Sequence, residues 1–298
     1  MCVAGVALAT RLEEKQEDSR MNEILVKKLL TPVTKLMVVK NPYVAAKVQP
    51  GQFVILRVRE KGERIPLTVA DYDREQDTIT LVFQEVGLTT RLLGQMEAGD
   101  SILNVVGPLG VPAELPEKGT VLVAGGGVGV APCLPKAKEM HTRGVKVISI
   151  LGARSADLII LEDQMRACSD EVYITTDDGS RGFHGYVADQ VRVLLEGGLK
   201  VDEVVAIGPM PAMRAVCDVT KPFGIKTWVS MNPIMVDGTG MCGACRVSVG
   251  GKTRFCCVDG PMFDGHEVDW QEAWRRANVY RDEEKIANDR CASCGGDR

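Results

Sequence analysis

The chain has 298 residues, which is enough for two or three domains with hydrophobic cores of their own. Its formal net charge is -4 and its Lys and Arg residues are scattered, which argues against a nucleic-acid-binding surface. No apolar run is long enough to span a membrane, and several of the ten cysteines crowd one end beside glycines, a pattern that favours metal binding in a reducing cytoplasm over a disulfide framework.

Residues 1–21 are expected to form an N-terminal extension outside the compact fold. A short apolar run opens the chain, and charged residues follow between Arg11 and Arg20. Ala7-Leu8-Ala9 loosely resembles a signal-peptidase site, but no basic segment precedes the run. We therefore expect the fold to begin near Asn22.

Residues 22–112 show the pattern of short strands separated by turns. The expected strands are rich in β-branched and apolar residues and cover 23–29, 35–40, 53–59, 78–84 and 101–106. Gln49-Pro50-Gly51-Gln52 and Glu97-Ala98-Gly99-Asp100 supply turn residues between strands. The economical interpretation is a small antiparallel barrel.

Residues 113–230 alternate between strands and helices. Strands are expected at 120–124, 145–151, 171–175, 203–207 and 226–231. Helices are expected up to about residue 143 and at 156–167, 186–196 and 211–220. Such alternation is typical of a doubly wound parallel sheet, so the expected fold class is a barrel followed by an α/β nucleotide domain.

Three glycine-bearing turns follow strands of this expected sheet. The first, Gly125-Gly126-Gly127-Val128-Gly129, does not complete the GxGxxG fingerprint, so a turn that serves only packing is an alternative. The others are Asp177-Asp178-Gly179-Ser180 and Gly208-Pro209-Met210. Because ligands bind at the carboxyl ends of strands in open α/β sheets, a nucleotide pocket is favoured. Arg154 follows another strand, where a cation could meet a 2′-phosphate or simply lie exposed.

The segment 231–270 contains the most specific motif. Asp237-Gly-Thr-Gly-Met-Cys242-Gly-Ala-Cys245 has the spacing of a plant-type [2Fe-2S] loop, with Asp237 at the position of the first cysteine. Glycines within the loop permit positive φ and close approach of the backbone to the cluster. Three sulfurs and one carboxylate would then bind it. A structural zinc site or a CxxC redox pair is the alternative.

The fourth ligand is Cys256 or Cys257. If residues 253–258 are extended, the two side chains point opposite ways and only one can face the cluster. The other is then a packed thiol.

Residues 271–298 are expected to form a C-terminal helix and tail. Cys291 and Cys294 have metal-ligand spacing, but a single CxxC pair supplies only two ligands. A free tail is favoured over a site shared with a partner chain.

The order of barrel, nucleotide domain and iron–sulfur loop resembles the ferredoxin-reductase-like flavoproteins. Within them, the chain is similar to the electron-transfer subunits of dihydroorotate dehydrogenases. It is more similar to the small subunits of electron-bifurcating NADH-dependent reduced ferredoxin:NADP oxidoreductases, also called sulfide dehydrogenases, in which an aspartate joins three cysteines on the cluster. The resemblance covers residues 22–269, and its motifs lie at 64–68, 87–90, 124–129, 206–211 and 236–242.

This resemblance implies a role for each motif. For the FAD isoalloxazine and its side chain it implies Arg64, Pro66, Leu67 and Thr68. Arg64 lies one residue further from Thr68 than the reductase arginine usually does, and an ordinary barrel-edge arginine is the alternative. For the FAD pyrophosphate, at the start of a short helix, it implies Gly87, Leu88, Thr89 and Thr90, with a simple helix cap as the alternative. The motif also has its fourth ligand directly before Val258, which selects Cys257.

The resemblance implies a cytoplasmic electron-transfer subunit that binds FAD, a [2Fe-2S] cluster and NAD(H), the last favoured over NADP(H). Its implied partner is a larger flavin and iron–sulfur subunit, through which ferredoxin is reached indirectly; no nucleic acid or membrane is expected. Two alternatives stay open. One is a dihydroorotate-type subunit without bifurcation, and the other is a non-enzymatic module in which Cys242, Cys245 and Cys257 hold zinc.

Overall fold

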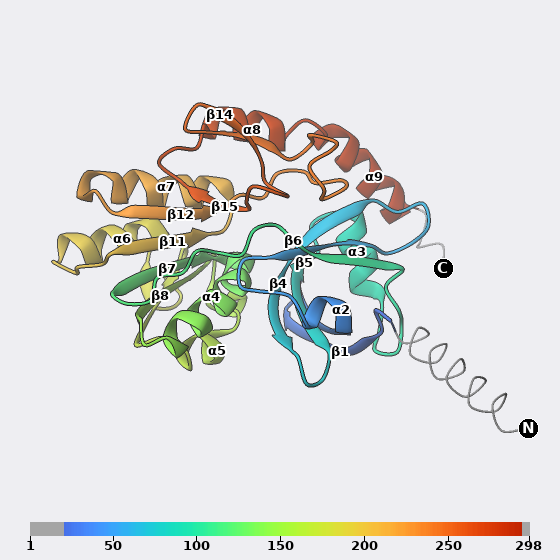
Figure 1. Cartoon of the computed structure of the whole chain (residues 1–298), viewed down its shortest axis with the longest axis horizontal. Coiled ribbons are helices and arrows are strands. Elements are labelled where there is room, and N and C mark those ends of the chain that lie inside the picture. Colours follow the sequence, from blue (N-terminus) through green and yellow to red (C-terminus); the bar gives the residue numbers. More distant parts are fainter. Residues whose placement is uncertain (1–20, 294–298) are drawn as a thin grey trace, which may run out of the picture.

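The computed structural model describes residues 21–293, with side chains as far as Asp289. Residues 1–20 of the expected extension, the side chain of Cys291 and all of Cys294 lie outside this description. Figure 1 shows two lobes side by side, a blue-to-teal barrel and a green-to-yellow α/β unit, with the orange-to-red C-terminal part extending across both.

Six antiparallel strands form the first lobe, in the order β1-β2-β5-β4-β3-β6. The barrel closes where β1 meets the chain before β6, because the Ile24 N–H donates to the Asp100 carbonyl at 2.8 Å and Glu23 bridges Ser101. The strands are β1 Ile24–Thr31, β2 Thr34–Lys40, β3 Phe53–Arg57, β4 Arg64–Asp73, β5 Thr78–Gln84 and β6 Asn104–Leu109, and the helices are α2 Pro42–Ala45 and α3 Leu88–Gln95. The predicted antiparallel barrel is confirmed.

Strand β4 is the one strand of the barrel that the sequence pattern did not predict. It contains Pro66, which cannot donate a hydrogen bond to a neighbouring strand and normally argues against an inner strand. Pro66 is compatible with this position because it pairs only with Ile55 of β3, whereas pairing with β5 begins at Val69.

Seven strands form the sheet of the second lobe, in the order β10-β9-β8-β7-β11-β12-β15, and all neighbours are parallel except β12 and β15. The strands are β7 Thr120–Gly126, β8 Lys146–Ala153, β9 Glu171–Thr176, β10 Phe183–His184, β11 Glu203–Ile207, β12 Lys226–Ser230 and β15 Met262–Asp264. The helices are α4 Val130–Thr142, α5 Glu162–Arg166, α6 Val187–Glu196 and α7 Met210–Thr220. The predicted parallel sheet is confirmed.

One predicted helix of this lobe is wrong in detail. The segment 156–167 is not continuous but splits into a short 3-10 turn, Ala156–Leu158, and α5. Leu161 between them has φ of 54°, a left-handed conformation through which an α-helix does not continue.

The C-terminal part is tied to both lobes. Strands β13 Arg246–Val249 and β14 Lys252–Phe255 form a hairpin, after which β15 joins the edge of the large sheet. Helix α8 Trp270–Ala277 lies beside the hairpin, and α9 Arg281–Ser293 lies against α3 of the barrel. Within residues 21–293, no helix combines the length and the apolar character that crossing a membrane requires.

Helix α4 joins the two lobes. Its Val130 belongs to the same buried cluster as Ala70 and Val82 of the barrel, and Lys138 forms an ion pair with Asp71. The lobes therefore share a continuous hydrophobic contact, with a polar pair at its margin.

The same helix carries a buried lysine. The Lys136 side chain is 1% exposed, and its ammonium donates to the Pro132 carbonyl at 2.9 Å. Burial lowers the pKa of Lys136 from 10.5 to about 8. Burial also raises the pKa of the nearby Cys133 thiol to about 12, so no thiolate balances the lysine charge near neutral pH.

We expect Lys136→Met to stabilise the protein at pH 7 by ~2 kcal/mol, because the folded wild type must hold a charge out of water. Below the folded pKa of about 8 both states are protonated and this cost is fully present. As the pH rises from about 8 to 10.5, only the unfolded chain keeps the proton, so wild-type stability increases. Chemical denaturation at pH 7 and at pH 10 should show a smaller difference in unfolding free energy between variant and wild type at the higher pH. A variant less stable at pH 7 would contradict this account.

Candidate functional site

The glycine turn after β7 lies at the carboxyl edge of the parallel sheet. A Cβ at Gly129 would lie 2.3 Å from the Ile207 carbonyl, so this glycine lets the turn pack against the end of β11. Gly127 has φ of 56° and no atom within 4 Å of the position of a Cβ, so it faces open space. The turn therefore combines the packing role of Gly129 with backbone that a ligand can approach closely.

Other sequence-predicted nucleotide residues lie at the same edge. Arg154 directly follows β8 and Asp177 directly follows β9, and the Asp177 N–H donates to the Ala153 carbonyl at 3.0 Å. Partial desolvation raises the pKa of Asp177, and the Arg154 guanidinium opposes this shift. Gly208 follows β11 and lies against the backbone of Gly126. Turns from four neighbouring strands, β9, β8, β7 and β11, thus meet along one edge.

The predicted FAD residues of the barrel lie on two elements. Pro66, Leu67 and Thr68 are in β4, and exposed Arg64 begins that strand. Gly87 immediately precedes α3, whose first residues include Thr89 and Thr90.

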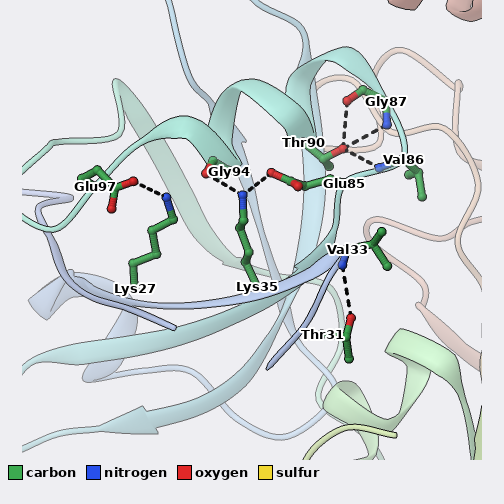
Figure 2. Close-up of polar contacts among 10 residues, drawn as sticks. All are labelled: Lys27, Thr31, Val33, Lys35, Glu85, Val86, Gly87, Thr90, Gly94 and Glu97. Atoms are coloured by element: carbon green, nitrogen blue, oxygen red, sulfur yellow. Dashed lines mark hydrogen bonds and ion pairs between the residues drawn. The ribbon is translucent and has the colours of Figure 1, made fainter. Parts of the chain in front are cut away.

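The hydroxyls at the start of α3 already have partners. The Thr90 hydroxyl donates to the Gly87 carbonyl and accepts from the N–H groups of Val86 and Gly87 at 3.1 and 3.0 Å (Figure 2). The Thr89 hydroxyl donates to the Glu63 carboxylate at 2.8 Å. Thr90 therefore caps the helix locally, and its hydroxyl fixes the backbone at the start of α3.

The candidate cluster loop is organised by its aspartate. One carboxylate oxygen of Asp237 accepts from the Thr239 N–H at 2.8 Å and the other from the Cys242 N–H at 2.9 Å. The hydrogen bond from Thr239 is the main cause that holds the pKa of Asp237 below its usual value. Gly238, Gly240 and Gly243 have φ of 78°, 81° and 68°, the conformation that the sequence spacing required of them.

Two of the candidate thiol ligands are already paired. Cys245 and Cys257 are buried, and the Cys245 thiol donates to the Cys257 sulfur at 3.2 Å. Burial raises the pKa of Cys257 to about 12. Cys242 is exposed, and no three metal-binding side chains converge closely anywhere in the described part of the chain. The donor set fits a [2Fe-2S] cluster, because two sulfurs are fixed and Cys242 and Asp237 lie on the loop that would wrap it.

The premise that Cys256 and Cys257 lie on an extended segment is wrong, although the choice of Cys257 came from the family motif and does not depend on it. Residues 253–258 are not all extended, since β14 ends at Phe255 and a turn follows, in which the Asp259 N–H donates to the Phe255 carbonyl at 2.7 Å. Both Cys256 and Cys257 are buried in this turn. Burial raises the pKa of the Cys256 thiol as well. Only Cys257 forms a sulfur contact with Cys245.

The cluster loop lies directly on the barrel. A Cβ at Gly238 would lie 2.7 Å from Leu109 Cδ1 and 2.8 Å from Ile55 Cδ1. Ile55 pairs with Pro66, one of the predicted FAD residues. Sequence reasoning did not identify Ile55 or Leu109 as part of the site. The available signal was the run Phe53–Leu56, whose unbroken apolar character indicates a strand buried on both faces.

Comparisons with known proteins agree on one family. The iron-sulfur cluster binding domain of dihydroorotate dehydrogenase B matches residues 232–269. A Thermotoga maritima protein named dihydroorotate dehydrogenase B (NAD(+)), electron transfer subunit homolog, is 46% identical over 277 residues, which cover 93% of this chain and 98% of the relative.

Solved structures are also similar. A structure described as giving insights into flavin-based electron bifurcation via the NADH-dependent reduced ferredoxin-NADP oxidoreductase is 46% identical, with a TM-score of 0.86 over 91% of this chain and 97% of the other. A ferredoxin reductase in carbazole 1,9a-dioxygenase, 17% identical with a TM-score of 0.58 over 68% of this chain and 65% of its own, shares the fold alone. The fold is therefore ferredoxin-reductase-like.

We expect Cys257→Ser to abolish the visible absorbance of a bound cluster, because it removes the sulfur that lies beside Cys245. Cys256→Ser is the matched control, since both thiols are buried in the same turn. This variant should keep its iron. Visible spectra and iron analysis of the two purified variants decide which cysteine is the ligand. Loss of the cluster in Cys256→Ser but not in Cys257→Ser would assign the ligand to Cys256.

Proposed function

The chain belongs to the family of dihydroorotate dehydrogenase B electron-transfer subunits and their homologues, and on this basis we propose that it is the FAD- and [2Fe-2S]-containing subunit of a heteromeric oxidoreductase. It exchanges hydride with NAD(H) and single electrons with a partner flavoprotein subunit. The observation that carries this proposal is the contact of Gly238, in the cluster loop, with the barrel strand that pairs with Pro66. That contact brings the two redox sites of one chain together.

The proposal gives each segment a task. Residues 22–112 bind FAD, 113–230 bind NAD(H), 231–270 bind the cluster, and 271–298 form the C-terminal helix and tail. When bound, FAD supplies the step between two-electron nicotinamide chemistry and one-electron cluster chemistry. The protein itself positions the cofactors, excludes water from them and places charged groups beside them.

In the barrel, Pro66, Leu67 and Thr68 offer backbone and side chain to the isoalloxazine from β4. The start of α3 offers the N–H groups of Leu88, Thr89 and Thr90 to the pyrophosphate. The Thr90 hydroxyl holds this backbone in place by accepting from the Gly87 N–H and donating to the Gly87 carbonyl. Arg64 is exposed at the start of β4, two residues before Pro66, and adds a positive charge near the residues proposed to bind the isoalloxazine.

In the α/β lobe, the glycine turn Gly125–Gly129 approaches the dinucleotide phosphates, and Gly208, Pro209 and Met210 line the neighbouring turn. Asp177 lies at the same edge and offers a carboxylate to the bound nucleotide. Arg154 lies beside Asp177 and balances its charge. NAD(H) is favoured over NADP(H) by the similarity to a relative named for NAD(+).

The partner is a larger subunit with a second flavin and further iron–sulfur clusters, through which ferredoxin is reached. Met241 of the cluster loop is 87% exposed, and Val236 and Val258 beside the loop are exposed too. An apolar rim of this kind suits a protein partner that takes electrons from the cluster. Asp237 in place of a cysteine favours the bifurcating ferredoxin:NADP type over the non-bifurcating dihydroorotate type. A cytoplasmic location belongs to the same proposal, because the thiolate ligands must stay reduced to bind iron.

Metal and flavin analysis tests this function directly. The purified protein should be yellow-brown, with FAD and about two irons per chain, and anaerobic NADH should bleach its flavin absorbance. A colourless protein that contains zinc would instead support the binding module without redox activity.

Asp237→Cys should still assemble a cluster but change its reduction potential by on the order of tens of millivolts, because an oxygen ligand donates less electron density than a thiolate. Asp237→Asn is the control for the hydrogen bonds to Thr239 and Cys242, which an amide oxygen can partly keep. Asp237→Asn should lose iron more readily than the wild type or Asp237→Cys. An anaerobic redox titration measures the potential of Asp237→Cys, and a value equal to that of the wild type would refute ligation by Asp237.

A further inference from the structure

The carbonyl groups around Cys245 all have partners on the protein side of the loop. The Gly243 carbonyl accepts from an Arg246 guanidinium nitrogen at 3.3 Å, and the Cys245 carbonyl accepts from the Cys256 N–H at 3.1 Å. The two remaining carbonyls, of Ala244 and Arg246, accept from a single side chain, that of Arg276. Both of its contacts are 3.1 Å long.

Arg276 comes from outside the matched iron–sulfur domain, which ends at residue 269. It lies in the last turn of α8, which is fixed to the cluster segment at its beginning. There the Asp269 N–H donates to the Ser248 carbonyl at 2.9 Å, and the Trp270 indole N–H donates to the Gly265 carbonyl at 3.0 Å. The guanidinium is therefore held against the loop by a helix that is itself anchored.

This arrangement orients the amide groups of the loop. In a trans peptide unit the C=O and the following N–H point in opposite directions. When the carbonyls of Gly243 and Ala244 point toward the two arginines, the N–H groups of Ala244 and Cys245 must point the other way. Neither of these N–H groups has an acceptor among the described residues. They are available as donors to a sulfide or thiolate on the side away from the arginines.

The guanidinium also brings charge. Arg276 is half-buried, and among the described residues no carboxylate lies within ion-pair distance of it. The guanidinium therefore forms no direct ion pair with a described residue, and the nearest acidic residue of its own helix on the same side is Glu272, one turn earlier. A positive charge beside a redox centre favours the form that carries one more electron.

We propose that Arg276 is a positioning residue for the cluster of the proposed function: it fixes the peptide unit between Ala244 and Cys245, together with the Arg246 carbonyl, and raises the reduction potential through its charge. The inference rests on the proposed function, since it concerns the same site. A purely structural clamp would hold α8 against the hairpin without moving the potential, which separates the two roles.

Three variants of the full chain test this. Arg276→Gln removes the charge and most of the clamp, and Arg276→Lys keeps the charge but cannot hold two carbonyls in a planar fork. Arg275→Gln is the matched control, because it removes the same charge from the neighbouring exposed position of α8, whose side chain forms no hydrogen bond or ion pair with residues 21–289. The readouts are the potential from anaerobic redox titration, the electron paramagnetic resonance spectrum of the reduced cluster, and the rate of iron loss to a chelator.

Arg276→Gln should lower the potential, alter the resonance spectrum and lose iron about 10-fold faster than Arg275→Gln, the size of effect typical of lost outer-shell contacts to a metal site. Arg276→Lys should lose iron faster than the wild type while its potential stays close to the wild-type value. FAD content and NADH-dependent flavin reduction should be unchanged in all three, which shows that the fold is intact.

The inference is overturned if Arg276→Gln matches Arg275→Gln in potential, spectrum and iron loss. If Arg276→Gln does not fold, Arg276→Lys decides alone, and a rate of iron loss equal to that of the wild type overturns the inference. Failure of the proposed function looks different, because the wild-type protein would then purify without iron before any variant is compared.

Discussion

The close approach of the cluster loop to the barrel is the constraint on which the rest of the structure depends. Gly238 lies against Ile55 and Leu109 with no room for a side chain of its own. The turn beyond the cysteines is tied to the same barrel edge, because the Val111 N–H donates to the Gly260 carbonyl at 2.7 Å. In the proposed function, electron transfer between a barrel site and a loop site needs this spacing to stay short. Glycine at 238 and the backbone bond at 260 keep it short without relying on flexible side chains.

Local sequence signals predicted most of the fold. The alternation in β5 and the continuous apolar strand β7 each identify a strand from a few neighbouring residues. The misses have a different origin. Strand β4 could not be predicted because it contains Pro66. This proline is tolerated only because β4 pairs with β3 alone at that position, and its pairing with β5 begins further along at Val69. The break at Leu161 could not be read from the chain either, since leucine has no local preference for the left-handed conformation found there.

The candidate site likewise contains features that the local sequence predicts and features that depend on the folded structure. The spacing of Asp237, Cys242 and Cys245 is a local property, and the sequence alone was enough to propose a cluster loop there. The choice between Cys256 and Cys257 could not rest on an extended segment, because the turn depends on contacts with Asp259. Arg276 was beyond sequence reasoning altogether. Its contact with carbonyls some thirty positions earlier in the chain exists only once α8 has packed.

Strand β15 is an edge strand of the large sheet, and it follows the cluster loop in the sequence. Until the loop has folded and β15 has paired with β12, β12 presents unpaired backbone groups at an open edge, the kind of surface onto which other chains add strands. A chain in which β15 is not yet paired therefore leaves this edge of the sheet open, and the folded chain covers it. The three residues Met262–Asp264 thus link the folding of the C-terminal segment to the protection of the large sheet's edge.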